Sequence, residues 1–520
     1  MRKNFFIHFL TTTTYGLIFI TITSCANFKP SSGNPFDIHE ATLTTLHAAI
    51  KNGTSCETIT KKYIHRIKTY DKSKNINAII LINPNAINRA KKLDQQFNLS
   101  ESQLALHCAP VILKDNFDTA DMPTEAGAIA LKGSIPPDDA FMVKQLRQAG
   151  AIIIAKSNMA EWAFSPYETI SSTHGETTNA YDSSRVPAGS SGGTASAIAA
   201  NFGIIGMGSD TGNSIRGPAS HSSLVGIRST IGMTSRDGVV PLLLNRDIAG
   251  PLTRTVEDAA ATFNIIAGYD PADSTTQAAK NYIKDDYTKY LKKNGLQKVR
   301  LGVLRQIYDE SSDPEIIALF DKAIHDLRKA GAIIVDPIQV SNFDKLKKEA
   351  GFCSRFRYDL DNYLNSLGKE APVKSLQEII NKKLFDDRNA GAMKWASSMK
   401  IKPEEQSPPC VDVEGDPRRK QFLTAVLTSM KEHQVDALVY PSWSNPPRKL
   451  GDRKSPHGNN SPVIAPHTGQ PALTVPMGFT NSGLPVGLQF LAAPYDEHLL
   501  FQFAYAYEQV TRHRKSPSHF

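Results

Sequence analysis

Several signatures of metal and cofactor chemistry are missing from this 520-residue chain. It has five cysteines but no Cys-x-x-Cys pair and no His-Glu-x-x-His pair. No Gly-Lys-Ser or Gly-Lys-Thr follows its glycine-rich stretches. These absences argue against a zinc centre, a dithiol redox site and a phosphate-binding loop. We therefore expect a function that uses no metal and no cofactor.

A strongly basic block is also lacking. The net charge of +8 is spread along the chain, and no nucleic-acid-binding motif accompanies it, so we expect no nucleic-acid partner. Internal repeats and low-complexity tracts are absent as well. With 40% hydrophobic and 21% charged residues, the composition is that of a globular protein. The length is compatible with one large domain or with two.

The N-terminus has no apolar run long enough to span a membrane comfortably. Arg2 and Lys3 precede a threonine-rich apolar stretch that is densest over residues 15–22, the layout of a secretory signal. It ends in Ile-Thr-Ser-Cys, which resembles a bacterial lipobox with Cys25 as the lipidated residue. The alternatives are a standard signal cleaved near Ala26, or an uncleaved anchor.

We predict a lipoprotein-type signal peptide over residues 1–24, lipidation of Cys25, and a polar tether over residues 25–37. The mature protein would then be exported and anchored at a bacterial cell envelope, on the periplasmic side or the cell surface. Its only membrane contact would be the lipid. An oxidising compartment permits disulfides, but the sequence does not pair the other four cysteines and does not indicate an oligomeric state. The four cysteines other than Cys25 are Cys56, Cys108, Cys353 and Cys410.

In the first half of the chain, short β-branched runs alternate with helical patterns. This alternation indicates an α/β domain with a mostly covered sheet. A further helix is predicted after Thr255, which can cap it, and it should stop near Gly268. The expected strands are 76–84, 109–119, 151–158 and 204–213, and the expected helices between them include 138–150 and 194–203.

The character of the sequence changes between about residues 275 and 430. Lysine-rich amphipathic patterns predict a helical segment here, including helices over 315–331 and 344–368. Beyond it, we expect a strand over 436–443, two strands around a Gly/Pro turn in 469–492, and a helix over 497–510.

The small residues "AGSSGG" at 188–193 allow three interpretations. They could form a flexible linker, although ordered elements flank them closely. They also match a Gly-x-Ser-x-Gly elbow with Ser191 as nucleophile, and Asp436 with His457 or His467 follows in a suitable order. An elbow needs a strand before it, however, and residues 173–188 are polar and turn-rich.

The third interpretation combines Lys114, Ser190 and Ser214. A serine hydroxyl is a weak nucleophile that needs a base within hydrogen-bond reach. A lysine is such a base only when neutral, and Lys114 ends a buried apolar run where desolvation favours the neutral amine. Ser190 can relay the proton between them, so no histidine is needed. The loop "SDTGN" before Ser214 can direct backbone N–H groups at an oxyanion.

This pattern resembles the amidase signature family. The family's core reads Gly-Gly-Ser-Ser-Gly-Gly, a helix, then Gly-Ser-Asp-x-Gly-Gly-Ser-Ile-Arg-x-Pro, and this chain has "AGSSGGTASAIAANFGIIGMGSDTGNSIRGP". The segment "PVILKDNFDT" with Lys114 is similar to the family's lysine segment. The resemblance covers residues 38–515. It implies one large domain with a central, mixed, twisted β-sheet flanked by helices on both faces, in which 275–430 builds the substrate pocket.

The resemblance also implies individual roles. Ser214 would be the acylated nucleophile, Ser190 a bridging serine held by a cis peptide bond, and Lys114 the base. The oxyanion N–H groups would come from Thr211, Gly212 and Asn213, in a loop braced by Asp210 and Arg216. The implied reaction is cofactor-free hydrolysis of a linear carboxamide, with a small molecule or short peptide amide as substrate.

Two positions depart from the family pattern. Ala188 stands where glycine is common, a change that we expect to be mild. Asn213 replaces the second glycine of Gly-Gly-Ser. If that position needs a positive φ, asparagine is the least penalised substitute. We expect the oxyanion hole to survive.

Within the family, the layout is most similar to peptide amidases, which remove a C-terminal amide, and to amidotransferase A subunits. The export signal argues against the cytoplasmic amidotransferase role. The membrane-docking helix of the fatty acid amide hydrolases has no counterpart in this sequence. A catalytically inactive, lipid-anchored binding protein on the same scaffold is the non-enzyme alternative.

Overall fold

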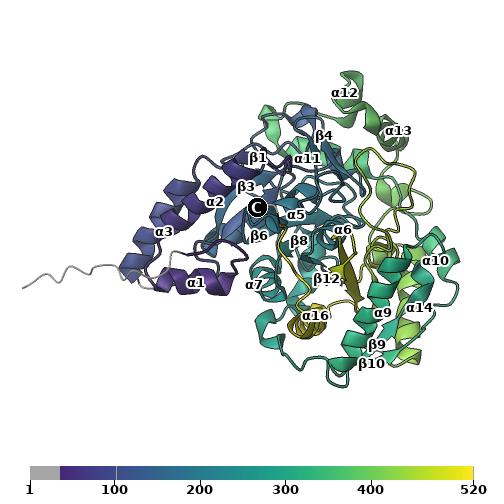
Figure 1. Ribbon diagram of the computed structural model, residues 1–520. Helices are drawn as coiled ribbons and strands as arrows, with labels where there is room; N and C mark the ends of the chain where they lie inside the picture. Colours follow the sequence, from purple (N-terminus) through teal and green to yellow (C-terminus); the bar gives the residue numbers. More distant parts are fainter. Residues whose placement is uncertain (1–35, 101, 519) are drawn as a thin grey trace, which may run out of the picture. The chain divides into compact units, whose positions relative to one another are not determined.

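A mixed β-sheet is the framework of the protein (Figure 1). In the computed structural model, which describes residues 36–100, 102–518 and 520, this sheet has eleven strands. Across the sheet they run β1 (Ile79–Ile82), β3 (Ile152–Ser157), β2 (Pro110–Lys114), β6 (Ile205–Asp210), β8 (Ile248–Thr253), β7 (Val225–Arg228), β12 (Ala472–Phe479), β13 (Pro485–Leu491), β11 (Ala437–Pro441), β9 (Arg300–Val303) and β10 (Ile333–Val335). The α/β class and the mixed sheet are both as predicted.

Three neighbouring strands carry the residues of interest to the same edge of the sheet. β2 lies between β3 and β6 and runs parallel to both, with Val111 opposite Ile153 and Ile205. Parallel strands end on the same side. Lys114, the last residue of β2, and Asp210, the last residue of β6, therefore lie at one edge.

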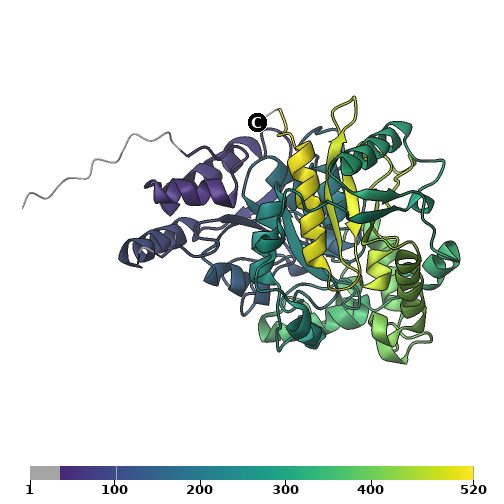
Figure 2. The same cartoon turned by 90° about the horizontal axis from the view of Figure 1, so that it is seen from below.

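Helices cover both faces of the sheet. On one face α7 (Val256–Ile266), α16 (Glu497–Thr511) and α9 (Pro314–Lys329) lie in a row, as both views show (Figures 1 and 2). On the other face lie the short helices α5 (Gly192–Ala199) and α6 (Arg216–His221). The first face uses long amphipathic helices, and the second brings two short helices to the edge where Lys114 lies.

Small residues allow α5 to approach the sheet closely. All eight of its residues are buried, and a Cβ added to Gly193 would clash with the carbonyl oxygen of Asn158 in the segment after β3. A Cβ on Gly206 of β6 would likewise collide with Thr194 and Ile198 of α5. The glycine and alanine content of "SGGTASAIAA" is thus explained by packing.

The remaining elements complete the layers around the sheet. They are α1 (Leu43–Lys51), α2 (Cys56–Tyr70), α3 (Ala86–Ser100), α4 (Phe141–Gln148), α8 (Ala279–Tyr282), α10 (Phe343–Glu349), α11 (Phe356–Ser366), α12 (Leu376–Asn381), α13 (Ala390–Ser398), α14 (Pro417–Glu432), α15 (Ala465–Thr468), and the hairpin of β4 (Thr169–Ser171) and β5 (Gly175–Thr177).

The segment 275–430 differs from the prediction in two ways. It contributes β9 and β10 to the sheet, so it is not purely helical. The helix predicted over 344–368 is divided into α10 and α11, because the chain leaves the helix at Ala350 and Gly351. Glycine is a poor helix former, which accounts for the break. The loop between the two helices, residues 350–355, contributes to the functional site.

The folded unit extends slightly beyond the predicted limits of 38 and 515. Phe36 is buried, and its carbonyl oxygen accepts a hydrogen bond from Lys62. At the other end Phe520 packs against Tyr70 and Phe202. The predicted signal peptide, Cys25 and nearly all of the predicted tether lie outside the described residues. In the described part of the chain, no helix has both the length and the apolar character needed to cross a bilayer.

Two disulfides pair the four cysteines of the folded unit. Cys56 bonds to Cys108 and Cys353 to Cys410, with Cα–Cα distances of 5.2 and 5.8 Å. The sequence left this pairing open. Within the described residues, Cys56, Cys108 and His107 form a cluster of metal-ligand types, but the disulfide withholds both sulfurs from a metal.

The cap of α7 provides a test of the link between sequence and stability. Thr255 Oγ1 accepts a hydrogen bond from the Asp258 amide at 3.1 Å. We expect Thr255→Ala to lower the free energy of unfolding by about 1 kcal/mol, because it leaves that amide without its capping partner. Urea unfolding of the full-length protein measures this loss. Thr255→Ser keeps the hydroxyl and should keep most of the stability; an equal loss in both variants would contradict the capping role.

Candidate active site

Lys114 lies fully buried at the end of β2, beside two serine hydroxyls. Its Nζ is 2.7 Å from Ser190 Oγ and 2.7 Å from Ser209 Oγ. Burial lowers the pKa of Lys114 to about 7, against the opposing influence of the Asp247 and Asp210 carboxylates. Removing an amine from water disfavours its charged form, and neutral hydroxyls do not compensate for that loss. A neutral amine is therefore accessible near neutral pH.

Ser190 is held by a tight backbone passage before α5. The Gly189–Ser190 peptide bond is cis, as the family resemblance implied. A Cβ on Gly189 would clash with the carbonyl oxygens of Ser165 and Glu168. The segment on each side of Ser190 thus requires small residues, and Ser190 itself is completely buried.

Ser214 lies in the loop between β6 and α6 and lines a cavity of about 370 Å³. The backbone N–H groups of this loop are unusual. In the described chain, none of those from Thr211 to Ser214 donates a hydrogen bond, whereas the amides of Ile215 and Arg216 both donate to Asp210 Oδ2. Unpartnered amides beside a hydroxyl are the arrangement required to bind an oxyanion.

Asp210 and Arg216 both bond within this loop. The Arg216 Nε atom is 3.1 Å from Asp210 Oδ2, and its Nη2 donates to the Gly212 carbonyl at 2.6 Å. Arg228 contributes a second buried ion pair to Asp210, at 3.1 Å. Burial alone would raise the pKa of Asp210, but the two guanidinium groups outweigh it and hold the pKa below its ordinary value. Asp210 therefore stays charged.

Of the two departures from the family pattern, Ala188 has the strained backbone and Asn213 does not. Asn213 does not adopt a positive φ; instead its side chain donates to the carbonyls of Gly189 and Pro166, at 3.0 and 3.2 Å. It thereby ties the Ser214 loop to the Ser190 segment. Ala188 is the residue with φ of 63°, in the region that costs a side-chain-bearing residue about 1 kcal/mol. The substitution expected to be mild is thus the strained one.

The elbow interpretation fails on geometry. The Ser191 side chain is buried at the start of α5 and donates to the Ser209 carbonyl, and no histidine contacts it among the described residues. His457 is bonded to Tyr167, and His467 to Arg246 and the Ala350 carbonyl. Asp436 is exposed and accepts from the amide of Arg300. These groups do not form a Ser-His-Asp triad.

Sequence reasoning missed Ser209 and most of the cavity wall. Ser209 completes the polar surroundings of Lys114 and also accepts from Asn116 at 3.0 Å. Its position directly before Asp210 in "GSDTGNS" is the only signal that could have identified it. The apolar wall of the cavity comes from separate parts of the chain: Phe164, Leu242, Leu243, Phe352 and Trp395.

Phe352 is positioned by the break between α10 and α11. Arg246 donates to the carbonyls of Ala350 and Gly351, both at 2.9 Å, and its guanidinium lies 4.7 Å from the centroid of the Phe352 ring. The Cys353–Cys410 disulfide fixes the next residue. A Cβ on Gly212 would be 3.5 Å from this ring, so Phe352 borders the loop that contains Ser214 directly.

Comparison with known proteins gives a consistent result. A family model described as Amidase matches residues 58–501. Among curated proteins, a probable amidase from Arabidopsis thaliana is 31% identical over 96% of this chain and 95% of its own length. The glutamyl-tRNA(Gln) amidotransferase A subunit from Gloeothece citriformis is 34% identical over 83% of this chain and 90% of its length.

Solved structures of amidases are similar to this chain as well. The native peptide amidase from Stenotrophomonas maltophilia superimposes with a TM-score of 0.83 at 33% identity, covering 93% of this chain and 99% of that one. An amidase family protein from Bacillus anthracis gives 0.81 at 34% identity, covering 92% and 93%.

The burial of Lys114 should be measurable as a pH-dependent stability term. The unfolded lysine keeps its proton up to its ordinary pKa of 10.5, and the folded one up to about pH 7. Between these values the unfolded state binds more protons, so wild-type stability rises with pH; below pH 7 both states are protonated and the term is flat. Relative to Lys114→Met, wild type should gain about 2–3 kcal/mol of unfolding free energy from pH 7 to 9.

Chemical denaturation of the full-length proteins at each pH measures this difference. The control is Lys132→Met, at an exposed lysine whose amine remains in water when the protein folds, and it should show no such change. A stability difference between wild type and Lys114→Met that stays constant from pH 7 to 9 would contradict the desolvated amine.

Proposed function

The chain belongs to the amidase family and is an amidohydrolase, and we propose that it cleaves linear carboxamides through an acyl-enzyme on Ser214. The observation that carries the mechanism is the contact between the buried, desolvated Lys114 amine and Ser190, whose segment is tied to the Ser214 loop by the hydrogen bond from Asn213 to the Gly189 carbonyl. No residue of a histidine triad takes part.

In the proposed reaction, neutral Lys114 removes a proton through Ser190, and Ser214 attacks the substrate carbonyl. The free amides of residues 211–214 bind the oxygen as it becomes negative. The relay then returns a proton to the leaving nitrogen, which departs as ammonia or an amine. Water attacks the ester by the reverse path and releases the acid. Neither step needs a metal or a cofactor.

We propose the C-terminal amide of a short peptide as the substrate. The likeness to the Stenotrophomonas maltophilia peptide amidase supports this substrate. The cavity wall of two leucines, two phenylalanines and a tryptophan suits an apolar side chain on the terminal residue. Amidotransferase A subunits are similar over most of this chain too, but the predicted export signal favours a hydrolase that acts alone.

We also propose that the protein is exported and lipid-anchored through Cys25. The signal-like N-terminus supports export, as does the pairing of all four cysteines of the folded unit, because disulfides persist mainly in oxidising compartments.

Serine substitutions separate the proposed nucleophile from the elbow serine. Ser214→Ala, Ser190→Ala and Lys114→Ala should each reduce kcat/KM on a peptide amide by a factor of about 10³ or more, because each interrupts the relay. Ser191→Ala, which lacks only the bond to the Ser209 carbonyl, is the matched control and should remain active. A fluorophosphonate probe should label Ser214. Labelling of Ser191 would support the elbow enzyme. An absence of labelling would support the inactive scaffold. Full activity of Ser214→Ala would refute the mechanism.

Lipidation is tested by expressing the full-length protein in a bacterial host. We expect it in the membrane fraction, with an acylated Cys25 at its N-terminus by mass spectrometry. Cys25→Ser should shift the protein to the soluble exported fraction or leave its signal uncleaved. A mature protein that begins at Ala26 without acyl groups would contradict the lipoprotein signal.

A further inference from the structure

A second cavity, of about 560 Å³, adjoins the one that contains Ser214. Asn459 lines both, so the two are neighbours. Their chemistry differs. The wall of the Ser214 cavity is largely apolar, whereas three basic side chains, Lys347, Arg448 and Lys454, line the second together with a single acidic one, Asp309.

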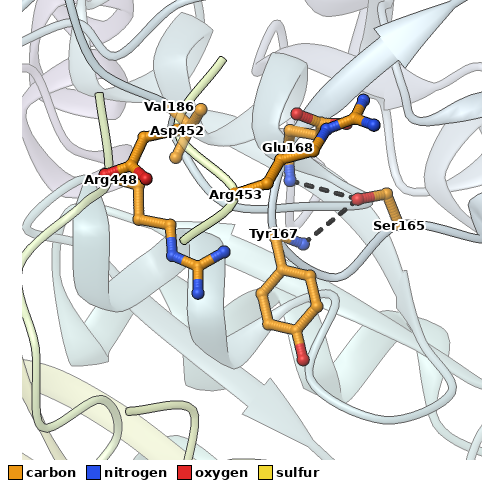
Figure 3. A pocket seen from close by; sticks show the side chains of 7 residues that line it. All are labelled: Ser165, Tyr167, Glu168, Val186, Arg448, Asp452 and Arg453. Atoms are coloured by element: carbon orange, nitrogen blue, oxygen red, sulfur yellow. Dashed lines mark hydrogen bonds and ion pairs between the residues drawn. The ribbon is translucent and has the colours of Figure 1, made fainter. Parts of the chain in front are cut away.

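Arg448 is the notable member of this set. Its guanidinium makes no hydrogen bond or ion pair with any described residue, and its Nε is buried without a partner. It lies 5.5 Å from the centroid of the Tyr167 ring, and Tyr167 also lines the Ser214 cavity. Figure 3 shows the guanidinium beside this ring and directed away from Arg453. A buried N–H donor without an acceptor costs free energy, which a ligand that supplies an acceptor would recover.

The nearby carboxylates already have other partners. Asp452 accepts hydrogen bonds from Ser455 and the Lys454 amide, which lower its pKa to about 2. Glu168 lies 3.4 Å from Arg453. Asp309 accepts from both the amide and the hydroxyl of Ser311, at 2.9 and 2.6 Å. The Arg448 charge acts on Asp452, but none of these carboxylates hydrogen-bonds to its guanidinium, and three basic side chains against one acidic one leave the cavity wall with an excess of positive charge.

Tyr167 of the Ser214 cavity is joined to His457, which lines the second cavity. His457 Nδ1 accepts from the Asn459 amide at 3.1 Å, which leaves the proton of the neutral ring on Nε2, 3.3 Å from the Tyr167 hydroxyl. Burial first, and then the charge of Arg448, lower the pKa of His457, so the ring stays neutral. The stack of Arg448 on Tyr167 is thus preorganised beside the Ser214 cavity.

We propose that this second cavity binds a carboxylate carried by the acyl part of the substrate. The inference rests on the proposed function: with the apolar terminal residue in the Ser214 cavity, the preceding residue passes Asn459 and Tyr167 and reaches Arg448. The preferred substrates are peptide amides with glutamate or aspartate before an apolar terminal residue. A planar guanidinium held on an aromatic ring is suited to bidentate carboxylate binding.

The test compares three matched substrates on the full-length protein: the C-terminal amides of N-acetyl-Glu-Phe, N-acetyl-Gln-Phe and N-acetyl-Lys-Phe. Wild type should show a kcat/KM about three- to tenfold higher for the Glu peptide than for the Gln peptide, as expected for a partly exposed charge pair. The Lys peptide should be the poorest. Raising the salt concentration should reduce the Glu preference.

Substitutions at Arg448 assign the preference to a residue. Arg448→Gln should bring the Glu-to-Gln ratio to about one, and Arg448→Glu should reverse the order in favour of the Lys peptide. Lys449→Gln is the matched control, because Lys449 is exposed and lines neither cavity, and it should keep the wild-type ratio. A wild-type ratio of one or less, or a Glu preference that survives in Arg448→Gln, would overturn the proposal.

Binding separates this proposal from the proposed function. If no amide is hydrolysed, the proposed function fails, and calorimetry of the same three amides with Ser214→Ala still tests the second cavity. There the Glu peptide should bind about three- to tenfold more tightly than the Gln peptide, and Arg448→Gln should remove the difference. Equal binding of the two peptides would refute the carboxylate site whether or not hydrolysis is observed.

Discussion

The burial of the Lys114 amine is the constraint on which the rest of the site depends. An amine at the end of a covered parallel strand loses its hydration, and its hydrogen-bond partners here are two hydroxyls. Those hydroxyls must come from β6 and from the segment before α5. The small residues of α5 allow that approach. The hydrogen bonds of the amine therefore depend on the close packing of α5 against the sheet.

The charged groups around Ser214 fall into two sets, one that holds the Ser214 loop and one that lines the adjoining cavity. The Asp210 carboxylate pairs with Arg216 and Arg228 and holds the loop, in which four consecutive amides donate to no group in the described part of the chain. An apolar wall lines the Ser214 cavity, and Arg448, whose guanidinium hydrogen-bonds to no described residue, lines the adjoining cavity. In the proposed reaction the substrate carbonyl would thus meet fixed dipoles, while the substrate side chains would meet surfaces that differ in polarity.

Local patterns predicted the elements well where one physical signal dominates. β-branched runs became β1, β2 and β3, and Thr255 caps α7 as expected. The prediction failed where two signals compete. The apolar periodicity of residues 344–368 suggested one helix, but Gly351 ended it, and the resulting loop carries Phe352 to the oxyanion loop. The sequence left the backbone conformation at Asn213 open, and the structure shows the positive φ at Ala188 instead.

The sequence by itself determined the fold class, because strand patterns are local properties, and the three residues proposed for the relay, because "PVILK", "AGSSGG" and "GSDTGNS" carry the resemblance to the family. Only the tertiary structure decided that Ser209 joins Ser190 beside Lys114, which cysteines pair, and which side chains line the cavities. Ser209 meets Lys114 across 95 residues of chain, and Arg448 meets Tyr167 although 281 residues separate them. Such contacts depend on strand register and on the packing of the whole sheet, and no short sequence pattern encodes them.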